Sequence, residues 1–67
     1  MSVARVTTLS ANSKTSFDDA IKEGITRASK TLRGVSGAWV KEQKVEIADG
    51  KVVAWHVVLE VTFVLED

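Results

Sequence analysis

The residues of this 67-residue chain that could do chemistry are few and widely spaced. The chain has one histidine, His56, two tryptophans, Trp39 and Trp55, and no cysteine. The lack of cysteine excludes a disulfide framework and a thiolate metal site, and a single histidine is too few for the usual zinc site. Because it also has no nucleophile, base and orienting group in a recognisable pattern and no Gly-rich phosphate loop, we expect a binding protein and not an enzyme.

The acidic residues are the remaining candidates for metal ligands. Calcium binds about six to eight oxygens in proteins, and no EF-hand pattern occurs among the nine dispersed Asp and Glu residues. A calcium site would therefore be assembled from loop carbonyls or from several copies of the chain. Glu42 and Glu60, which fall in predicted strands, are the candidate ligands, and solvated surface charges are the alternative interpretation.

The charge balance and the ends of the chain limit its partners. Nine basic residues balance nine acidic ones, so the chain has no net charge with which to attract nucleic acid or an anionic membrane. Its start lacks the basic-then-apolar layout of a signal peptide, and His56 interrupts the longest apolar run, residues 52–59. We therefore predict a cytoplasmic protein with neither nucleic acid nor a membrane as partner.

One amphipathic helix is predicted in the first half of the chain. Ser16 is the expected N-cap, with Asp19 three residues later in a short-armed capping box. Apolar and small residues then recur on one helical face up to Arg33, and Gly34 stands where a left-handed C-cap is favoured. Gly24 lies within the apolar face, where a close approach of another segment would explain it.

Three β-strands are predicted around this helix. Residues 3–9 are rich in β-branched types, and the polar residues 10–15 after them indicate a loop. Residues 39–47 and 52–65 flank Asp49-Gly50, which is the typical signal of a two-residue hairpin turn. The predicted element order is β-α-β-β.

The last strand is apolar on both faces, and its register decides what lies beside His56. Trp55 lies on the face that the helix should cover, so we expect it in the core. A two-residue turn would place Gln43 opposite His56, whereas a longer bulged loop would reverse that assignment. With the two-residue turn, the residues that share the second face with His56 are Trp39, Gln43, Val45 and Ile47.

This second apolar face predicts self-association. A chain of about 60 residues buries only about 60% of its unfolded surface, and 45% of these residues are hydrophobic. One helix cannot cover both faces of a sheet, and exposed apolar sheet surfaces usually mark an interface. We predict a closed homo-oligomer.

Several segments resemble one protein family in their order and spacing. The segments are Thr15-Ser16-Phe17-Asp18-Asp19-Ala20, Arg27-Ala28-Ser29-Lys30-Thr31-Leu32-Arg33, Val40-Lys41-Glu42-Gln43, Asp49-Gly50-Lys51-Val52 and Val61-Thr62-Phe63, followed by the acidic end. With them the chain resembles the dodecins over nearly its whole length. The resemblance implies a single α+β domain, residues 1–67, in which the helix packs on a curved three-stranded antiparallel sheet, and a hollow homododecamer of such protomers.

The resemblance also implies a ligand. Flavin-binding dodecins stack paired flavin rings against a tryptophan near the start of the second strand, and a glutamine of the third strand hydrogen-bonds the ring edge. In this chain the tryptophan position falls on Gly37 and the glutamine position on His56. Trp39 is two residues from Gly37, so on a continuous strand it projects from the same face about 6–7 Å away.

Three functions follow from these departures. The chain looks most like the calcium dodecins, so storage of calcium by a homododecamer, through Glu42 and Glu60, is the first hypothesis. The second is binding of riboflavin or FMN, with Gly37, Trp39, Gln43 and His56 as candidate cofactor-binding residues. The third is a purely structural or partner-docking oligomer, in which Trp39 and His56 are ordinary interface residues.

Overall fold

The computed structural model describes residues 3–65, which form three strands and one helix. The elements are β1 (Ala4–Ser13), α1 (Phe17–Thr31), β2 (Val35–Ala48) and β3 (Lys51–Val64). β3 is the central strand of the sheet and pairs antiparallel with β1 on one side and β2 on the other. The α+β class and the β-α-β-β order are confirmed, whereas the acidic end, Glu66 and Asp67, lies outside the described residues.

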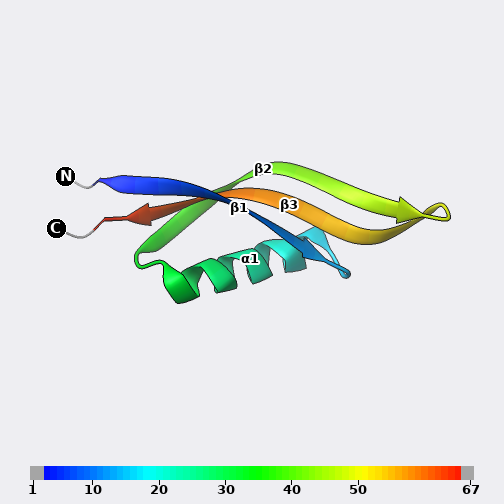
Figure 1. The fold of residues 1–67 in the computed structure, drawn as a ribbon, viewed down its shortest axis with the longest axis horizontal. Coiled ribbons are helices and arrows are strands. Elements are labelled where there is room, and N and C mark those ends of the chain that lie inside the picture. Colours follow the sequence, from blue (N-terminus) through cyan, green and yellow to red (C-terminus); the bar gives the residue numbers. More distant parts are fainter. Residues whose placement is uncertain (1–2, 66–67) are drawn as a thin grey trace.

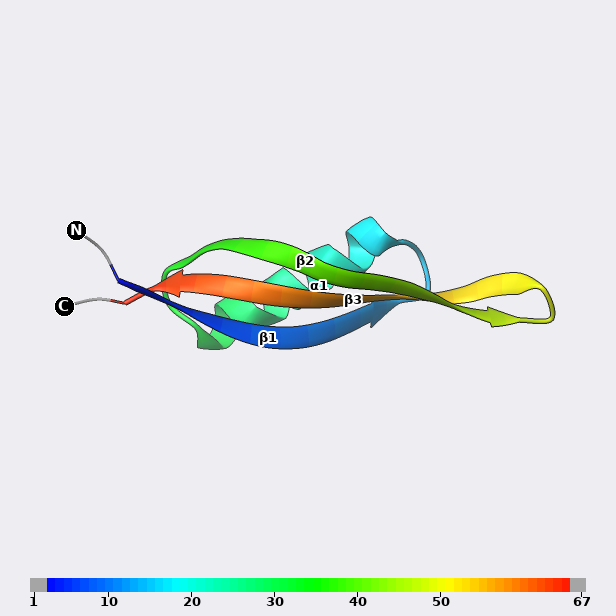
Figure 2. The same ribbon diagram turned by 90° about the horizontal axis from the view of Figure 1, so that it is seen from above.

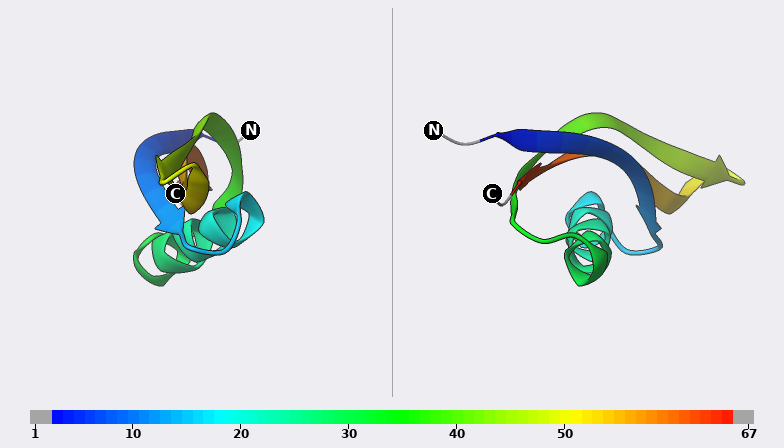
Figure 3. Two further views of the ribbon diagram at one scale, coloured as in Figure 1. Left: turned by 90° about the vertical axis from the view of Figure 1, so that its right-hand side faces the viewer. Right: turned by 60° about the vertical axis from the view of Figure 1, so that its left-hand side comes forward.

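The helix covers only part of one face of the sheet (Figure 1). Figure 2 shows α1 beneath the strands, while the β2–β3 hairpin continues well beyond both the helix and the end of β1. The sheet curves around the helix in Figure 3, and the molecule measures 52 × 19 × 13 Å. Among residues 3–65, neither α1 nor β1 consequently covers the outer part of the hairpin.

The N-terminus of α1 is held by two serine hydroxyls. The backbone N–H of Asp19 donates to Ser16 Oγ at 3.0 Å, which confirms Ser16 as the N-cap. The buried Ser13 hydroxyl donates to Asp19 Oδ2 at 2.7 Å and accepts from the backbone N–H of Thr15 at 2.9 Å. The end of β1 and the start of α1 are thereby fixed to each other.

The C-terminus of α1 comes two residues earlier than predicted. The helix ends at Thr31, not at Arg33, because Leu32 already has an extended backbone. Gly34 adopts the predicted left-handed conformation, with φ 74°, and its carbonyl accepts from the backbone N–H of Val64 at 2.9 Å. This hydrogen bond joins the start of β2 to the end of β3.

The core between α1 and the sheet is small and tightly packed at Gly24. Its buried residues are Ala20, Val57, Leu59 and Val61. A Cβ atom at Gly24 would lie 3.0 Å from Leu59 Cδ1 and 3.2 Å from Ala11 Cβ. The close approach is therefore one of side chains from the sheet, which explains why glycine stands in the apolar face of the helix.

Two strand boundaries differ from the prediction. Residues 10–13 were predicted as loop but continue β1, where they pair with residues 55–58 of β3. Polar side chains do not prevent a strand when a neighbouring strand supplies the hydrogen bonds, because β-propensity depends on context. For the same reason β2 begins at Val35, four residues before the predicted start at Trp39.

The β2–β3 hairpin has the predicted turn but not a regular ladder. Asp49 and Gly50 both have positive φ, 52° and 74°, as a two-residue turn between right-twisted strands requires. The ladder then shifts next to the turn, where Glu46 pairs with Ala54 but Ile47 pairs with Val52. One extra residue of β3, Val53, changes the pairing of the following residues.

This irregularity makes the predicted position of Gln43 wrong. Lys44 lies opposite His56, while Gln43 and Val45 lie opposite Val57 and Trp55 on the other face.

A second shift, between Val40 and Glu42, restores the predicted register farther along. Trp39 therefore pairs with Glu60 and Gly37 with Thr62, on the same face as His56.

Trp55 does not belong to the core, contrary to the prediction. It is only half-buried and lies outside the cluster around Leu59. It faces the helix side of the sheet, but it pairs with Ser13 at the last residue of β1, where the cover from β1 and α1 ends. Alternation along a strand shows which face a residue takes and not how far the covering helix extends.

The same substitution at two glycines should affect stability differently. We expect Gly24→Val to lower the free energy of unfolding by about 2 kcal/mol or more, because the new side chain overpacks against Leu59 and Ala11. Gly37→Val is the control, since nothing lies within 4 Å of its would-be Cβ, and it should not lower stability. Chemical denaturation measures both, and equal stability of the two variants would contradict the packing described for α1.

Candidate functional site

The face of the sheet opposite α1 carries the candidate ligand-binding residues. Trp39 projects from this face with 63% of its surface exposed, and Gly37 lies two residues before it on β2. His56 lies on the same face of β3, four residues from Glu60, the partner of Trp39. That spacing corresponds to about 13 Å along the strand. We call this face of the sheet, which α1 does not cover, the uncovered strip. It has the indole of Trp39 toward one end and the imidazole of His56 toward the other.

His56 borders a shallow cavity of about 230 Å³ on this strip. All three strands contribute to it, since Ser10 comes from β1, Glu42 and Lys44 from β2, and Val58 from β3. The cavity combines hydroxyl, carboxylate, ammonium and imidazole groups around an aliphatic side chain. It can therefore hydrogen-bond the polar edge of a small molecule while contacting an apolar part of it.

Glu46 holds the imidazole of His56 by a short hydrogen bond. His56 Nε2 lies 2.8 Å from Glu46 Oε2, and the two side chains are 29% and 56% exposed. The hydrogen bond from His56 and the charge of its ring lower the pKa of Glu46, with a smaller contribution from the Lys44 ammonium. Glu46 is accordingly an ionised acceptor at neutral pH, and Nε2 must carry the hydrogen.

The candidate metal ligands share a face but do not form a metal site within one protomer. Glu42 lies opposite Val58, two residues along β3 from Glu60, so both carboxylates project from the uncovered face. Among residues 3–65, no group of three or more His, Cys, Asp or Glu side chains comes together. Calcium prefers more oxygens than two carboxylates supply.

Sequence reasoning placed Gln43 in the site and missed Glu46. Gln43 lies on the opposite face from His56, where it is exposed and not covered by the helix. Glu46 and Lys44 take its place beside His56 because the ladder shifts near Val53. No local sequence signal marks this shift, since Val53 stands among other strand-forming residues.

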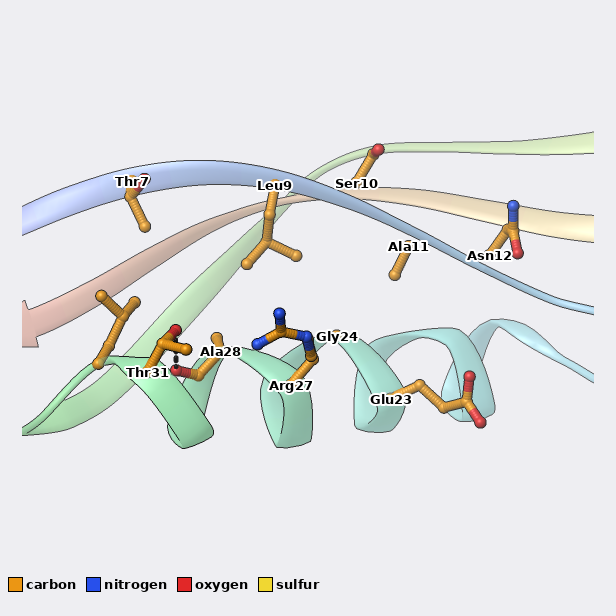
Figure 4. A pocket seen from close by; sticks show the side chains of 11 residues that line it. Thr7, Leu9, Ser10, Ala11, Asn12, Glu23, Gly24, Arg27, Ala28 and Thr31 are labelled. Atoms are coloured by element: carbon orange, nitrogen blue, oxygen red, sulfur yellow. Dashed lines mark hydrogen bonds between the residues drawn. The ribbon is translucent and has the colours of Figure 1, made fainter.

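A larger cavity of about 550 Å³ lies between β1 and α1 (Figure 4). Its walls include Leu9 and Ala11 of the strand and Ala28 of the helix, and the Arg27 side chain reaches into the gap between the two elements. It shares only Ser10 with the cavity at His56, and the two open on opposite sides of the sheet. None of the predicted site residues contributes to it.

Comparison with known proteins now gives the family. The Dodecin family model matches residues 3–66. The chain belongs to the dodecin family. The helix in the described range 3–65 is too short and too polar to cross a membrane.

Solved dodecin structures superpose closely on this chain. The dodecin from Streptomyces coelicolor is 36% identical, with a TM-score of 0.91, over 98% of this chain and 94% of the other. The dodecin from Streptomyces davaonensis is 35% identical, with a TM-score of 0.92, over 98% and 97% of the two chains. A tryptophan-to-phenylalanine variant of the Thermus thermophilus dodecin is 36% identical, with a TM-score of 0.93, over both entire chains. No curated protein matches the chain.

The uncovered strip differs at two positions from the tryptophan and glutamine expected for flavin-binding dodecins. Gly37 leaves open space where a tryptophan is expected, and Trp39 supplies the aromatic ring two residues along the same face. His56 stands where a glutamine is expected, and it is held by Glu46. The dodecin fold is retained while the groups that it presents on this face differ.

Proposed function

We propose that this dodecin is a homo-oligomeric binding protein that sequesters a planar aromatic ligand of the flavin type, such as riboflavin or FMN. The observation that carries the proposal is the 63% exposed indole of Trp39, which lies on the uncovered strip together with His56. An exposed tryptophan on a sheet face is a platform on which a fused ring system can stack. Binding and release of the ligand, without chemical change, is the proposed activity.

The ligand is held between copies of the chain. A ring stacked on Trp39 has its second face in water unless another protomer covers it, because no element within residues 3–65 lies above this strip. Trp39 and His56 are also offset by about 13 Å along the strand, so they contact one ring more easily from two neighbouring protomers. Ligand binding then stabilises the assembly by mass action.

The remaining exposed apolar residues support self-association. Between residues 3 and 65, the large exposed hydrophobic residues on the strands or directly beside them are Val3, Val6, Trp39, Val40, Ile47, Val52, Val53 and Leu65. Most of them belong to β2 or to the hairpin that α1 leaves uncovered. A closed assembly of twelve copies, consistent with the family, buries these residues against apolar residues of neighbouring protomers. Because the chain lacks cysteine, we place this assembly in the cytoplasm.

Calcium storage is the second candidate function, although the sequence alone ranks it first. The order changes because only two of the roughly six or more oxygen ligands that calcium needs can be named, Glu42 and Glu60, whereas the stacking platform for a ring, Trp39, is complete and exposed in one protomer. The observation in favour of calcium is that the two carboxylates share a face, because protomers related by a symmetry axis can bring several copies of them together.

Titration calorimetry of the assembled protein with calcium chloride tests this candidate. The calcium hypothesis predicts a saturable heat that Glu42→Gln reduces at least about tenfold in affinity, because carboxylates dominate calcium binding. Lys22→Gln, on the helix side, is the control for a change of surface charge. No saturable heat with the wild-type protein would exclude calcium.

Riboflavin fluorescence tests the flavin hypothesis. We expect the assembled protein to quench it with saturation, and Trp39→Leu to weaken binding at least about tenfold, because stacking and apolar contact are lost together. Trp55→Phe is the matched control on the other face and should leave the affinity within about twofold. The mass of each variant is measured in parallel, so that loss of assembly is distinguished from loss of the platform.

An absence of quenching by the wild-type protein would contradict the flavin proposal. If neither riboflavin nor calcium binds, the structural or partner-docking oligomer becomes the better description of the chain.

A further inference from the structure

We propose that Glu46 fixes His56 as a hydrogen-bond acceptor toward the ligand, so that the site selects planar rings carrying an N–H donor at their edge. The inference rests on the proposed function and adds the chemical feature by which the ligand is recognised. Glu46 acts here as a positioning residue, because it contacts His56 and not the ligand. The acceptor atom is the other ring nitrogen of His56, Nδ1.

The tautomer of His56 follows from its contact with Glu46. An ionised carboxylate can only accept, so the 2.8 Å contact between His56 Nε2 and Glu46 Oε2 requires the hydrogen to be on Nε2. A neutral imidazole with its hydrogen on Nε2 has a lone pair and no hydrogen on Nδ1. In this tautomer, Nδ1 can therefore accept a hydrogen bond but cannot donate one.

His56 Nδ1 is open to a ligand. The structure shows one hydrogen bond for the His56 side chain among the described residues, the bond from Nε2 to Glu46. Every buried side-chain nitrogen or oxygen in residues 3–65 has a partner, so the unpaired Nδ1 of this half-buried residue must reach solvent. The cavity beside His56 provides room for the edge of a ring.

A histidine at this position differs chemically from the glutamine expected for flavin-binding members. A glutamine amide both donates and accepts, so it can pair with an N–H and with a carbonyl of a ring edge. His56 with its Nε2 hydrogen engaged offers only the acceptor. A flavin has one N–H at its polar edge, N3–H, between two carbonyl groups, and that N–H is the group that Nδ1 selects.

Two flavins that differ in one methyl group test the ligand side of the proposal. Riboflavin and N3-methylriboflavin are titrated into the assembled protein at pH 8, with fluorescence quenching as the readout. We expect the methylated flavin to bind about tenfold more weakly, because it lacks the donor.

The outcomes separate the two proposals. Equal binding of both flavins at pH 8 overturns the acceptor role of His56 and leaves flavin binding in place. Quenching by neither flavin overturns the proposed function and, with it, this selection.

Nitrogen NMR tests the protein side without any ligand. His56 is the only histidine of the chain, so ¹⁵N-histidine labelling gives signals from one ring. At pH 8 we expect a protonated Nε2 and an unprotonated Nδ1, and a mixture of tautomers in Glu46→Val. Glu60→Val is the matched control for this signal, because it removes a carboxylate from the same face that does not contact His56. A hydrogen on Nδ1 in the wild-type protein at pH 8 would overturn the proposal.

Discussion

The packing of a single short helix against one part of a long curved sheet is the constraint on which the rest of the structure depends. The fully buried side chains gather around Leu59, where α1 contacts β1 and β3, and Gly24 lets the helix approach the sheet there. Beyond this area the β2–β3 hairpin extends with apolar residues on its surface. Hydrophobic burial must therefore continue between copies of the chain, since one protomer cannot complete it.

The same constraint creates the candidate site. A face that α1 does not cover can present Trp39 and His56 outward, and neither residue is needed for the core. Gly37 and His56 stand where the resemblance to flavin-binding members leads us to expect a tryptophan and a glutamine, while the fold is shared at a TM-score above 0.9 with dodecins of about 36% identity. Packing around Leu59 determines the fold, and the open face can vary its chemistry independently.

Features that depend on neighbouring residues could be predicted from the sequence. Ser16 caps the helix, Gly34 takes a left-handed conformation and Asp49-Gly50 forms the turn, because each needs only a few adjacent residues to act. The family resemblance added the antiparallel sheet, which the structure confirms. Trp39 and His56 share a face as predicted, although the ladder shifts once between them and once between His56 and the turn.

Features that depend on distant residues could not be predicted. The ladder with β3 extends β1 through its polar residues, and the length of α1 decides that Trp55 lies outside the core. The irregularity at Val53 brings Glu46 to His56 and takes Gln43 to the other face. These outcomes follow from the pairing of residues across the sheet. The alternation of residue types along one strand does not specify that pairing.

The most direct measurement for this account is the mass of the purified protein by sedimentation velocity over a wide range of concentration. If the uncovered hairpin must be buried by other copies, the particle has about twelve times the 7.3 kDa mass of one chain and keeps that mass on dilution to micromolar protein. A folded particle of 7.3 kDa that remains monomeric at high concentration would show that one helix suffices, and it would contradict both the assembly and the sites proposed between its copies.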